Sequence, residues 1–199
     1  MPQKPEFISF GDSGRIEKLK NDSVGFVNCL DIQIEELCEI RNPQLRDDKE
    51  GLNKKKKAYN NEYKEKGQYC YFPWKKKCVA ILPEDLFFEV RTARNRDLIT
   101  KEEQKDFRQV AIAIAGLSVG SNIARLCVLQ GGPKKINLAD PDTIGLSNLN
   151  RILAGVDDLG RKKTEALAEK LYEMDPYLEI TQFDEGANDI DKFIRNGNK

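Results

Sequence analysis

The chain has 199 residues, a length that suits one medium domain or one domain with a smaller partner. Lys and Arg together number 33, as do Asp and Glu, so the formal net charge is zero. This balance argues against a dedicated nucleic-acid or membrane-surface protein, whose affinity comes from excess positive charge. The chain contains no histidine, which excludes histidine-based catalysis and zinc sites built on Cys/His clusters.

The cysteines and the N-terminus bear on the cellular compartment. Five cysteines without any CxxC pair favour reduced thiols, as in the cytosol. The segment MPQKPEFISF lacks the apolar core of a signal peptide, and no apolar run is long enough to span a bilayer. We therefore expect a soluble, cytoplasmic protein.

The first ninety residues predict a tail followed by a small α+β extension. We expect residues 1–24 to form an N-terminal tail and residues 25–90 to form the extension. The polar segment 45–68 is typical of a solvated helix or a mobile loop, because acidic residues flank its lysines. Within the extension, apolar spacing and turn residues predict a helix over 26–40, strands over 69–72 and 78–82, and a helix over 84–91.

Residues 91–199 alternate between strand and helix patterns. Thr100 opens a helix with a capping-box pattern. The apolar run at 110–116 predicts a parallel strand covered on both faces. The later elements are a helix over 121–130 with Ile123, Leu126 and Cys127 on its core side, a strand over 134–140, a helix over 160–176, a strand over 178–186 and the start of a helix over 188–195.

This alternation predicts an α/β fold with a Rossmann-like, doubly wound, mostly parallel sheet. Three strands are few for such a sheet, so we expect an incomplete, C-terminally truncated domain. The sequence therefore predicts the N-terminal half of a nucleotide-binding domain over residues 91–199.

A glycine-bearing turn joins the first of these strands to its helix. Its residues Gly116, Ser118, Gly120 and Ser121 would point backbone N–H groups and the positive end of the helix at one place, which suits a phosphate. Asp140 closes the next strand, where a carboxylate can accept hydrogen bonds from ribose hydroxyls. The alternative for Asp140 is an aspartate that caps the turn before Pro141.

Polar and cationic groups follow Asp140 in two clusters. In the string DPDTIGLSNLNR, Asn148 and Arg151 can donate to phosphate oxygens, a feature that oxidoreductases of this fold do not need. Gly160-Arg-Lys-Lys163 then brings three cations to a helix start, where positive charge opposes the macrodipole. These cations need either a bound anion or solvent, and we favour the anion.

In order and spacing, GLSVGSNIA, LADPDTIGLSNLNR and GRKKTEALAEKLYEMDPYLEI resemble the ThiF-type adenylyltransferases. These proteins are related to the activating enzymes of ubiquitin-like modifiers. The resemblance covers roughly residues 91–186. The form of the glycine turn and the segment from FPWKKK to EEQ are similar to a bacterial subgroup in which this module precedes a nitroreductase-like domain.

The resemblance implies an ATP-dependent reaction that activates a carboxylate as an acyl-adenylate. The carboxylate would belong to the C-terminus of a ubiquitin-like protein or to a small molecule. By position, Asp140 matches the residue that binds the ribose, and Asp142 matches a second acid. Asn148, Arg151 and Lys163 match the groups that hold the triphosphate and stabilise the transition state.

The resemblance also implies a homodimer and a metal ion. Arg94 matches an arginine that reaches the ATP of the opposite subunit in dimeric members. The family's Mg²⁺-binding aspartate follows a further strand, beyond Lys199, so we expect no metal ligand within this chain. We therefore expect the full-length protein to be the adenylyltransferase and this chain alone to be inactive.

Two alternatives stay open. A nicotinamide-dependent Rossmann oxidoreductase would share the glycine turn and Asp140, but it would leave Lys163 unexplained. A nucleotide-binding or dimerisation scaffold without catalytic activity is favoured modestly by Leu117 and Ile152, which replace residues common in the family. Cys127 is expected to belong to the core in every case.

Overall fold

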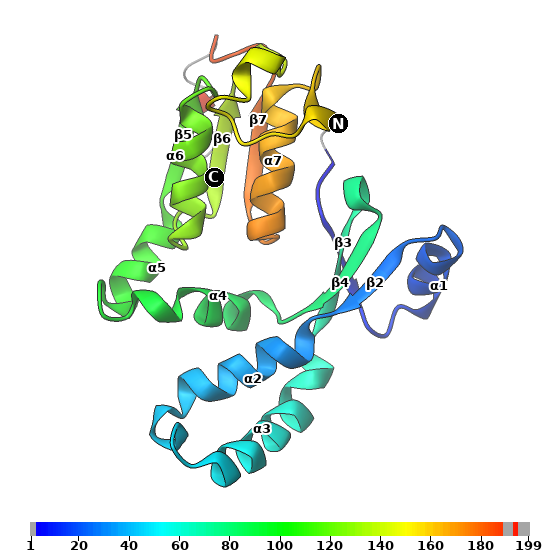
Figure 1. Ribbon diagram of the computed structural model, residues 1–199, viewed down its shortest axis with the longest axis vertical. Coiled ribbons are helices and arrows are strands. Elements are labelled where there is room, and N and C mark those ends of the chain that lie inside the picture. Colours follow the sequence, from blue (N-terminus) through cyan, green and yellow to red (C-terminus); the bar gives the residue numbers. More distant parts are fainter. Residues whose placement is uncertain (1–2, 189–192, 195–199) are drawn as a thin grey trace. The chain divides into compact units, whose positions relative to one another are not determined.

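The computed structural model describes residues 3–188 and 193–194, and its chain divides into two compact units (Figure 1). The first unit comprises residues 4–94, and the second comprises Gln3 and the described residues from Asn95 onward. The helix start expected near residue 188 lies mostly outside the described residues.

The first unit is a four-stranded sheet with helices, in the strand order β1-β3-β4-β2. Strand β3 is antiparallel to β1 and β4, whereas β2 runs parallel to β4. The elements expected over 69–72, 78–82 and 84–91 are present. The unit consists of β1 (Glu6–Ser9), α1 (Ser13–Asn21), β2 (Gly25–Asn28), α2 (Leu30–Arg41), α3 (Lys49–Tyr63), β3 (Gln68–Phe72), β4 (Lys77–Ile81) and α4 (Glu84–Thr92).

The first unit differs from the sequence expectation at its N-terminal end. Residues expected to be a tail form β1 and α1, because Ile8 and Leu19 are buried together with Val24 and Cys78. Strand β2 takes the first residues of the helix expected over 26–40. The polar segment at 45–68 contains the helix α3, which Lys56 ties to α2 through ion pairs.

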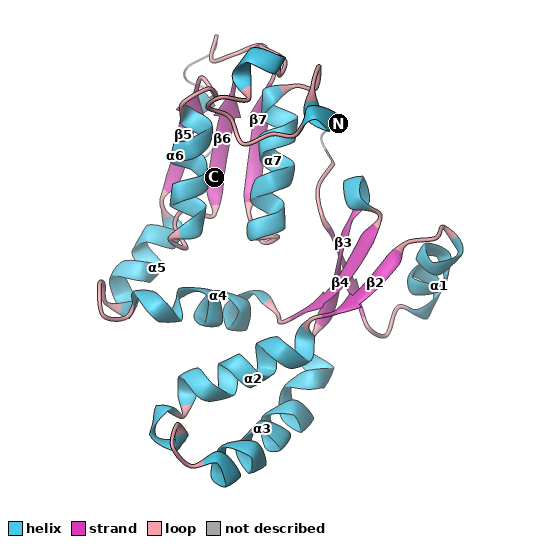
Figure 2. Cartoon of the chain, in the orientation of Figure 1, coloured by secondary structure: helices cyan, strands magenta, loops and turns pink. Residues whose placement is uncertain are grey.

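The second unit contains a parallel sheet in the order β5-β6-β7, which confirms the expected α/β fold. Its helices α6 and α7 pack against each other on one face of the sheet (Figure 2). A complete capping box at Thr100 begins α5, as expected. The elements are α5 (Lys101–Gln109), β5 (Ala111–Ala115), α6 (Gly120–Leu129), β6 (Lys135–Ala139), α7 (Lys163–Met174) and β7 (Glu179–Phe183).

The expected burial of β5 and α6 is wrong in two respects. Strand β5 is half-exposed rather than covered on both faces, because it lies at the edge of the described sheet and α6 and α7 lie on one face only (Figure 2). On α6, Ile123 and Leu126 are 52% and 58% exposed, whereas Ala124 and Val128 are buried. Small residues face the sheet because the helix lies close to it: a Cβ atom on Gly120 would lie 2.6 Å from Cγ2 of Ile114.

None of the described helices is long and apolar enough to cross a bilayer.

The thiols should fall into two classes in a labelling experiment. Cys38, Cys70 and Cys78 are buried, and burial raises the pKa of Cys70 to about 12 and that of Cys78 to about 11. Because the thiolate is the reactive form, we expect these three to react with a disulfide reagent at pH ~8 only after unfolding. Cys29 and Cys127 are half-buried and should react in the native protein. Mass spectrometry of the labelled peptides, with a urea-unfolded control, checks this; rapid native labelling of Cys70 would contradict it.

Candidate functional site

The turn between β5 and α6 has the geometry expected of an anion-binding turn. Gly116 has a φ of 83°, in the left-handed region that favours glycine. Its N–H group donates to the carbonyl of Ala139 at 2.8 Å, which joins the ends of β5 and β6. The buried Ser121 donates through its hydroxyl to the carbonyl of Ser118 at 3.1 Å. The turn therefore holds the N-terminus of α6 at the carboxyl edge of the sheet.

Asp140 connects the turn to the rest of the site. Its buried carboxylate accepts hydrogen bonds from the backbone N–H of Leu117 at 2.6 Å and from that of Asp142 at 2.9 Å. The ammonium group of Lys163 lies 3.4 Å from the same carboxylate. Asp140 therefore does cap its own turn, the alternative considered from sequence, and it also links the glycine turn to α7.

Lys163 is the buried cation of this site. It is the first residue of α7, and its side chain is only 6% exposed. Its Nζ atom lies 2.7 Å from Oδ2 of Asp142, whose side chain is 67% exposed. Burial would lower the pKa of Lys163, but the hydrogen bond to Asp142 and the charge of Asp140 outweigh burial and raise it. In return, the hydrogen bond from Lys163 lowers the pKa of Asp142. The pair is therefore charged throughout the neutral pH range.

The three cations before α7 have partners inside the protein. Arg161 donates to Asp158 at 2.8 Å and to Glu169 at 2.6 Å, and both carboxylates are buried. Lys162 donates to the carbonyl of Pro141 at 3.0 Å. Arg161 and Lys163 thus pair with carboxylates of the chain itself, a source of negative charge that was not among the two expected from sequence, a bound anion and solvent. Sequence reasoning missed the Arg161 network, although the spacings of Asp158 and Glu165 from Arg161, at i–3 and i+4, suit a helix start.

Asn148 and Arg151 lie in the loop after β6 and do not contact the Asp140–Lys163 pair. Oδ1 of Asn148 accepts from the N–H of Gly145 at 2.9 Å, which closes the turn in which it lies. The exposed Arg151 donates to the carbonyl of Ser147 at 3.1 Å. The carbonyl of Arg151 accepts from the side chain of Asn122 at 3.1 Å, so this loop is fastened to α6.

Arg94 is the last residue of the other compact unit. It lies in a short 3-10 turn over Ala93–Asn95. Its role at the site therefore stays a prediction.

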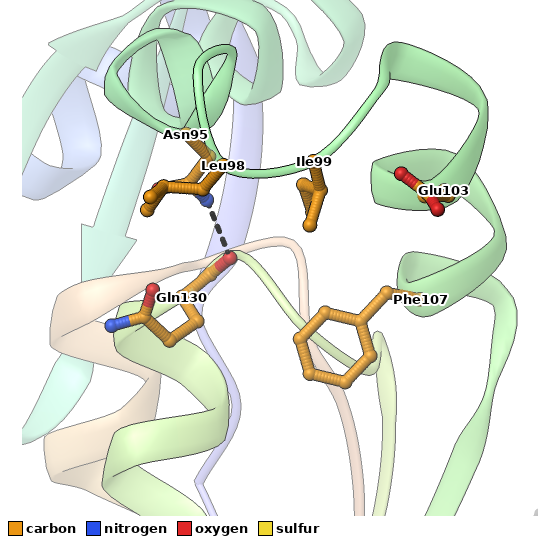
Figure 3. Close-up of a pocket in the computed structure, with 6 residues that line it drawn as sticks. All are labelled: Asn95, Leu98, Ile99, Glu103, Phe107 and Gln130. Atoms are coloured by element: carbon orange, nitrogen blue, oxygen red, sulfur yellow. Dashed lines mark hydrogen bonds between the residues drawn. The ribbon is translucent and has the colours of Figure 1, made fainter.

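A pocket of about 370 Å³ lies at the other end of α6 (Figure 3). Asn95 donates to the carbonyl of Gln130 at 3.0 Å there. Since α6 has ten residues and each adds about 1.5 Å, this pocket lies about 15 Å from the glycine turn. It is therefore separate from the candidate site. Its lining residues are Asn95, Leu98, Ile99, Glu103, Phe107 and Gln130.

Among the residues that the structure describes, no group of three or more Cys, Asp or Glu side chains could hold a metal ion.

Replacing Arg161 by methionine should destabilise the second unit. The change leaves the carboxylates of Asp158 and Glu169 buried without their cation, and breaking such a pair costs about 3 kcal/mol. Urea unfolding should show this loss in the free energy of unfolding. Lys170→Met, which removes a half-buried cation of α7 with no carboxylate partner in the described residues, is the matched control and should change it by less than about 1 kcal/mol. Equal stabilities of the two variants would contradict the prediction.

Several known proteins are similar to part of the chain. It is 40% identical over 129 residues to the uncharacterized protein MT1398 of Mycobacterium tuberculosis, covering 64% of this chain and 18% of that protein. It is 30% identical over 99 residues to tRNA threonylcarbamoyladenosine dehydratase 1 of Saccharomyces cerevisiae, and the match covers 49% of this chain and 23% of that protein. It is 30% identical over 76 residues to ubiquitin-like modifier-activating enzyme 5 of Arabidopsis thaliana, and the match covers 38% of this chain and 18% of that protein. The chain thus spans about a fifth of the length of these curated relatives.

A solved structure with a similar fold is that of the tRNA N6-threonylcarbamoyladenosine dehydratase of E. coli. The match has a TM-score of 0.52 and 24% identity, and it covers 58% of this chain and 48% of that chain. This likeness supports the Rossmann-like α/β architecture. The model of the ThiF family matches residues 92–197, more than half of the sequence, and the chain belongs to that family.

Proposed function

We propose that this chain carries the ATP-binding part of an adenylyltransferase that activates a carboxylate. One observation carries the proposal: the N-terminus of α6, the buried carboxylate of Asp140 and the buried ammonium of Lys163 meet at the carboxyl edge of the parallel sheet. Open α/β sheets bind ligands at this edge. A nucleotide needs these three kinds of group, for its phosphates and its ribose.

In the proposed reaction, a carboxylate oxygen attacks the α-phosphorus of ATP in line. The bond between the α-phosphorus and the bridging oxygen breaks, and pyrophosphate takes the electron pair. Negative charge is redistributed over the phosphate oxygens as this happens, so fixed cations and N–H groups lower the barrier. Lys163 and Arg151 are the proposed cations, Asn148 is a neutral donor to the phosphates, and Asp140 anchors the ribose.

The substrate belongs to one chemical class in this proposal. The named relatives include an enzyme of tRNA threonylcarbamoyladenosine and enzymes that activate ubiquitin-like modifiers. A threonylcarbamoyl group and a protein C-terminus both present a carboxylate. We therefore propose a carboxylate substrate, either a ubiquitin-like protein or a small molecule.

Three further features belong to the proposal. A homodimer would let Arg94 of one subunit reach the ATP of the other. Mg²⁺ would arrive as its ATP complex, because Mg²⁺ binds largely through substrate phosphates and water. The free thiols favour a reducing compartment such as the cytoplasm.

The alternatives are less favoured. A nicotinamide-dependent oxidoreductase would use the glycine turn and Asp140 but has no task for Lys163. A scaffold without chemistry would use Lys163 only as the structural partner of Asp140 and Asp142, and it would leave the match to the ThiF family without a catalytic purpose.

The first test concerns ligand choice and uses the full-length protein, which we expect to extend past Lys199. Titration calorimetry should show that ATP binds and that NAD binds at least about tenfold more weakly, because only ATP offers a triphosphate to Lys163 and the α6 N-terminus. Asp140→Asn should weaken ATP binding. Asp157→Asn, an exposed carboxylate in the loop before α7, is the control and should leave binding unchanged. Tighter binding of NAD than of ATP would contradict the proposal.

The second test, on the full-length protein, separates an enzyme from a scaffold. Lys163→Met should slow ATP–pyrophosphate exchange about a hundredfold while changing the Kd for ATP much less, because Lys163 meets charge that is redistributed in the transition state. Lys170→Met is the matched control and should exchange at the wild-type rate. Wild-type protein that binds ATP but exchanges no pyrophosphate with any carboxylate offered would favour the scaffold.

A further inference from the structure

Two carboxylates of the chain hold Lys163 in place. Its Nζ atom lies 2.7 Å from Asp142 and 3.4 Å from Asp140, so Asp142 is the closer partner. The two carboxylates differ in burial and in the number of their hydrogen-bond partners. Asp140 is buried and accepts two backbone N–H groups in addition to Lys163. Asp142 is largely exposed, and among the described residues only Lys163 forms a hydrogen bond with its carboxylate.

The backbone fixes the position from which Asp142 reaches Lys163. The N–H of Lys163 donates to the carbonyl of Asp142 at 3.2 Å. Thr143 forms an isolated antiparallel bridge with Lys162, and the N–H of Ile144 donates to the carbonyl of Arg161 at 2.9 Å. The segments 142–144 and 161–163 are therefore tied together, and the side chain of Asp142 lies directly at the ammonium group.

The charges argue against Asp142 as a ligand of the nucleotide. Two carboxylates surround one ammonium group, so the cluster carries a formal net charge of about −1 at neutral pH. A triphosphate would be repelled by the exposed carboxylate and attracted by Lys163. Because Asp142 repels the triphosphate and holds Lys163, we expect it to assist the reaction through the position of Lys163. The hydrogen bond to Lys163 keeps the ammonium charged despite its burial.

We propose that Asp142 is a positioning residue: its carboxylate holds the ammonium of Lys163 at the carboxyl edge of the sheet before the nucleotide binds, and Asp142 does not itself bind the nucleotide. The proposal rests on the function proposed above and deepens it. Preorganised charge is most effective when it needs no rearrangement at the moment of reaction. Removing Asp142 should therefore affect the chemical step and spare ATP binding.

The first experiment needs no nucleotide. The free protein is acylated with a succinimidyl ester at pH ~8, and mass spectrometry measures the rates at Lys163 and Lys162 separately. Asp142→Asn should raise the rate at Lys163 about fivefold or more, because the amine loses the partner that keeps it protonated and covered. The rate at Lys162 is the internal reference and should not change. Asp157→Asn should change neither rate. An unchanged rate at Lys163 in Asp142→Asn would overturn the proposal.

The second experiment is a double-mutant cycle on ATP binding and on ATP–pyrophosphate exchange. Compared with the wild-type protein, Asp142→Asn should have an equal or lower Kd for ATP and a kcat that is reduced about tenfold. In the background of Lys163→Met, the same change should reduce kcat less than about twofold, since the residue it positions is gone. Asp142→Glu, which keeps the charge, should recover part of the loss in kcat. A structural role alone would give equal losses in both backgrounds.

The outcomes separate the two proposals. If Asp142→Asn weakens ATP binding equally with and without Lys163, Asp142 is a ligand of the nucleotide or its metal, and the positioning proposal is overturned while the proposed function stands. If the full-length wild-type protein binds no ATP, the proposed function fails. The acylation rates would then still decide whether Asp142 holds Lys163.

Discussion

The carboxylate of Asp140 is the interaction on which the site depends. It is a buried charge at the end of the central strand β6, and such a charge is stable only when it is hydrogen-bonded and paired. Backbone N–H groups on both sides of the strand end and the ammonium of Lys163 meet this need. The same three contacts bring the glycine turn, the loop after β6 and the start of α7 to one place.

The need to pair buried charges also explains the loop before α7. Asp158 and Glu169 are buried, and Arg161 is held between them. The hydrogen bond to Glu169 raises the pKa of Arg161 above its already high value, so this cation never titrates. The Arg161 network fixes the loop, and Lys163, two residues later, is left to face the site. The stabilising cation Arg161 and Lys163, the cation proposed to bind phosphate, are thus two residues apart in sequence but have different carboxylate partners.

The sequence could predict features that depend on local patterns. The capping box at Thr100, the alternation of β5, β6 and β7 with helices, and the turn at Gly116 each depend on residues close together in the chain. It could not predict which face of α6 is buried. That helix is apolar on several sides, and the close approach of the sheet selects the small residues Gly120 and Ala124 over the larger ones.

At the candidate site, the sequence likewise could not predict which charged side chains form ion pairs. A sequence displays Asp140, Asp142 and Lys163 as three ionisable residues of suitable spacing, and a family resemblance assigns each of them to the nucleotide. Their pairing depends on distances between segments twenty residues apart, and at 2.7 Å the ion pair of Asp142 with Lys163 changes what Asp142 does. In our proposal, the exposed carboxylate of Asp142 acts on the nucleotide through the cation that it holds. The difference is measurable, because a ligand and a positioning residue shift Kd and kcat in different ways.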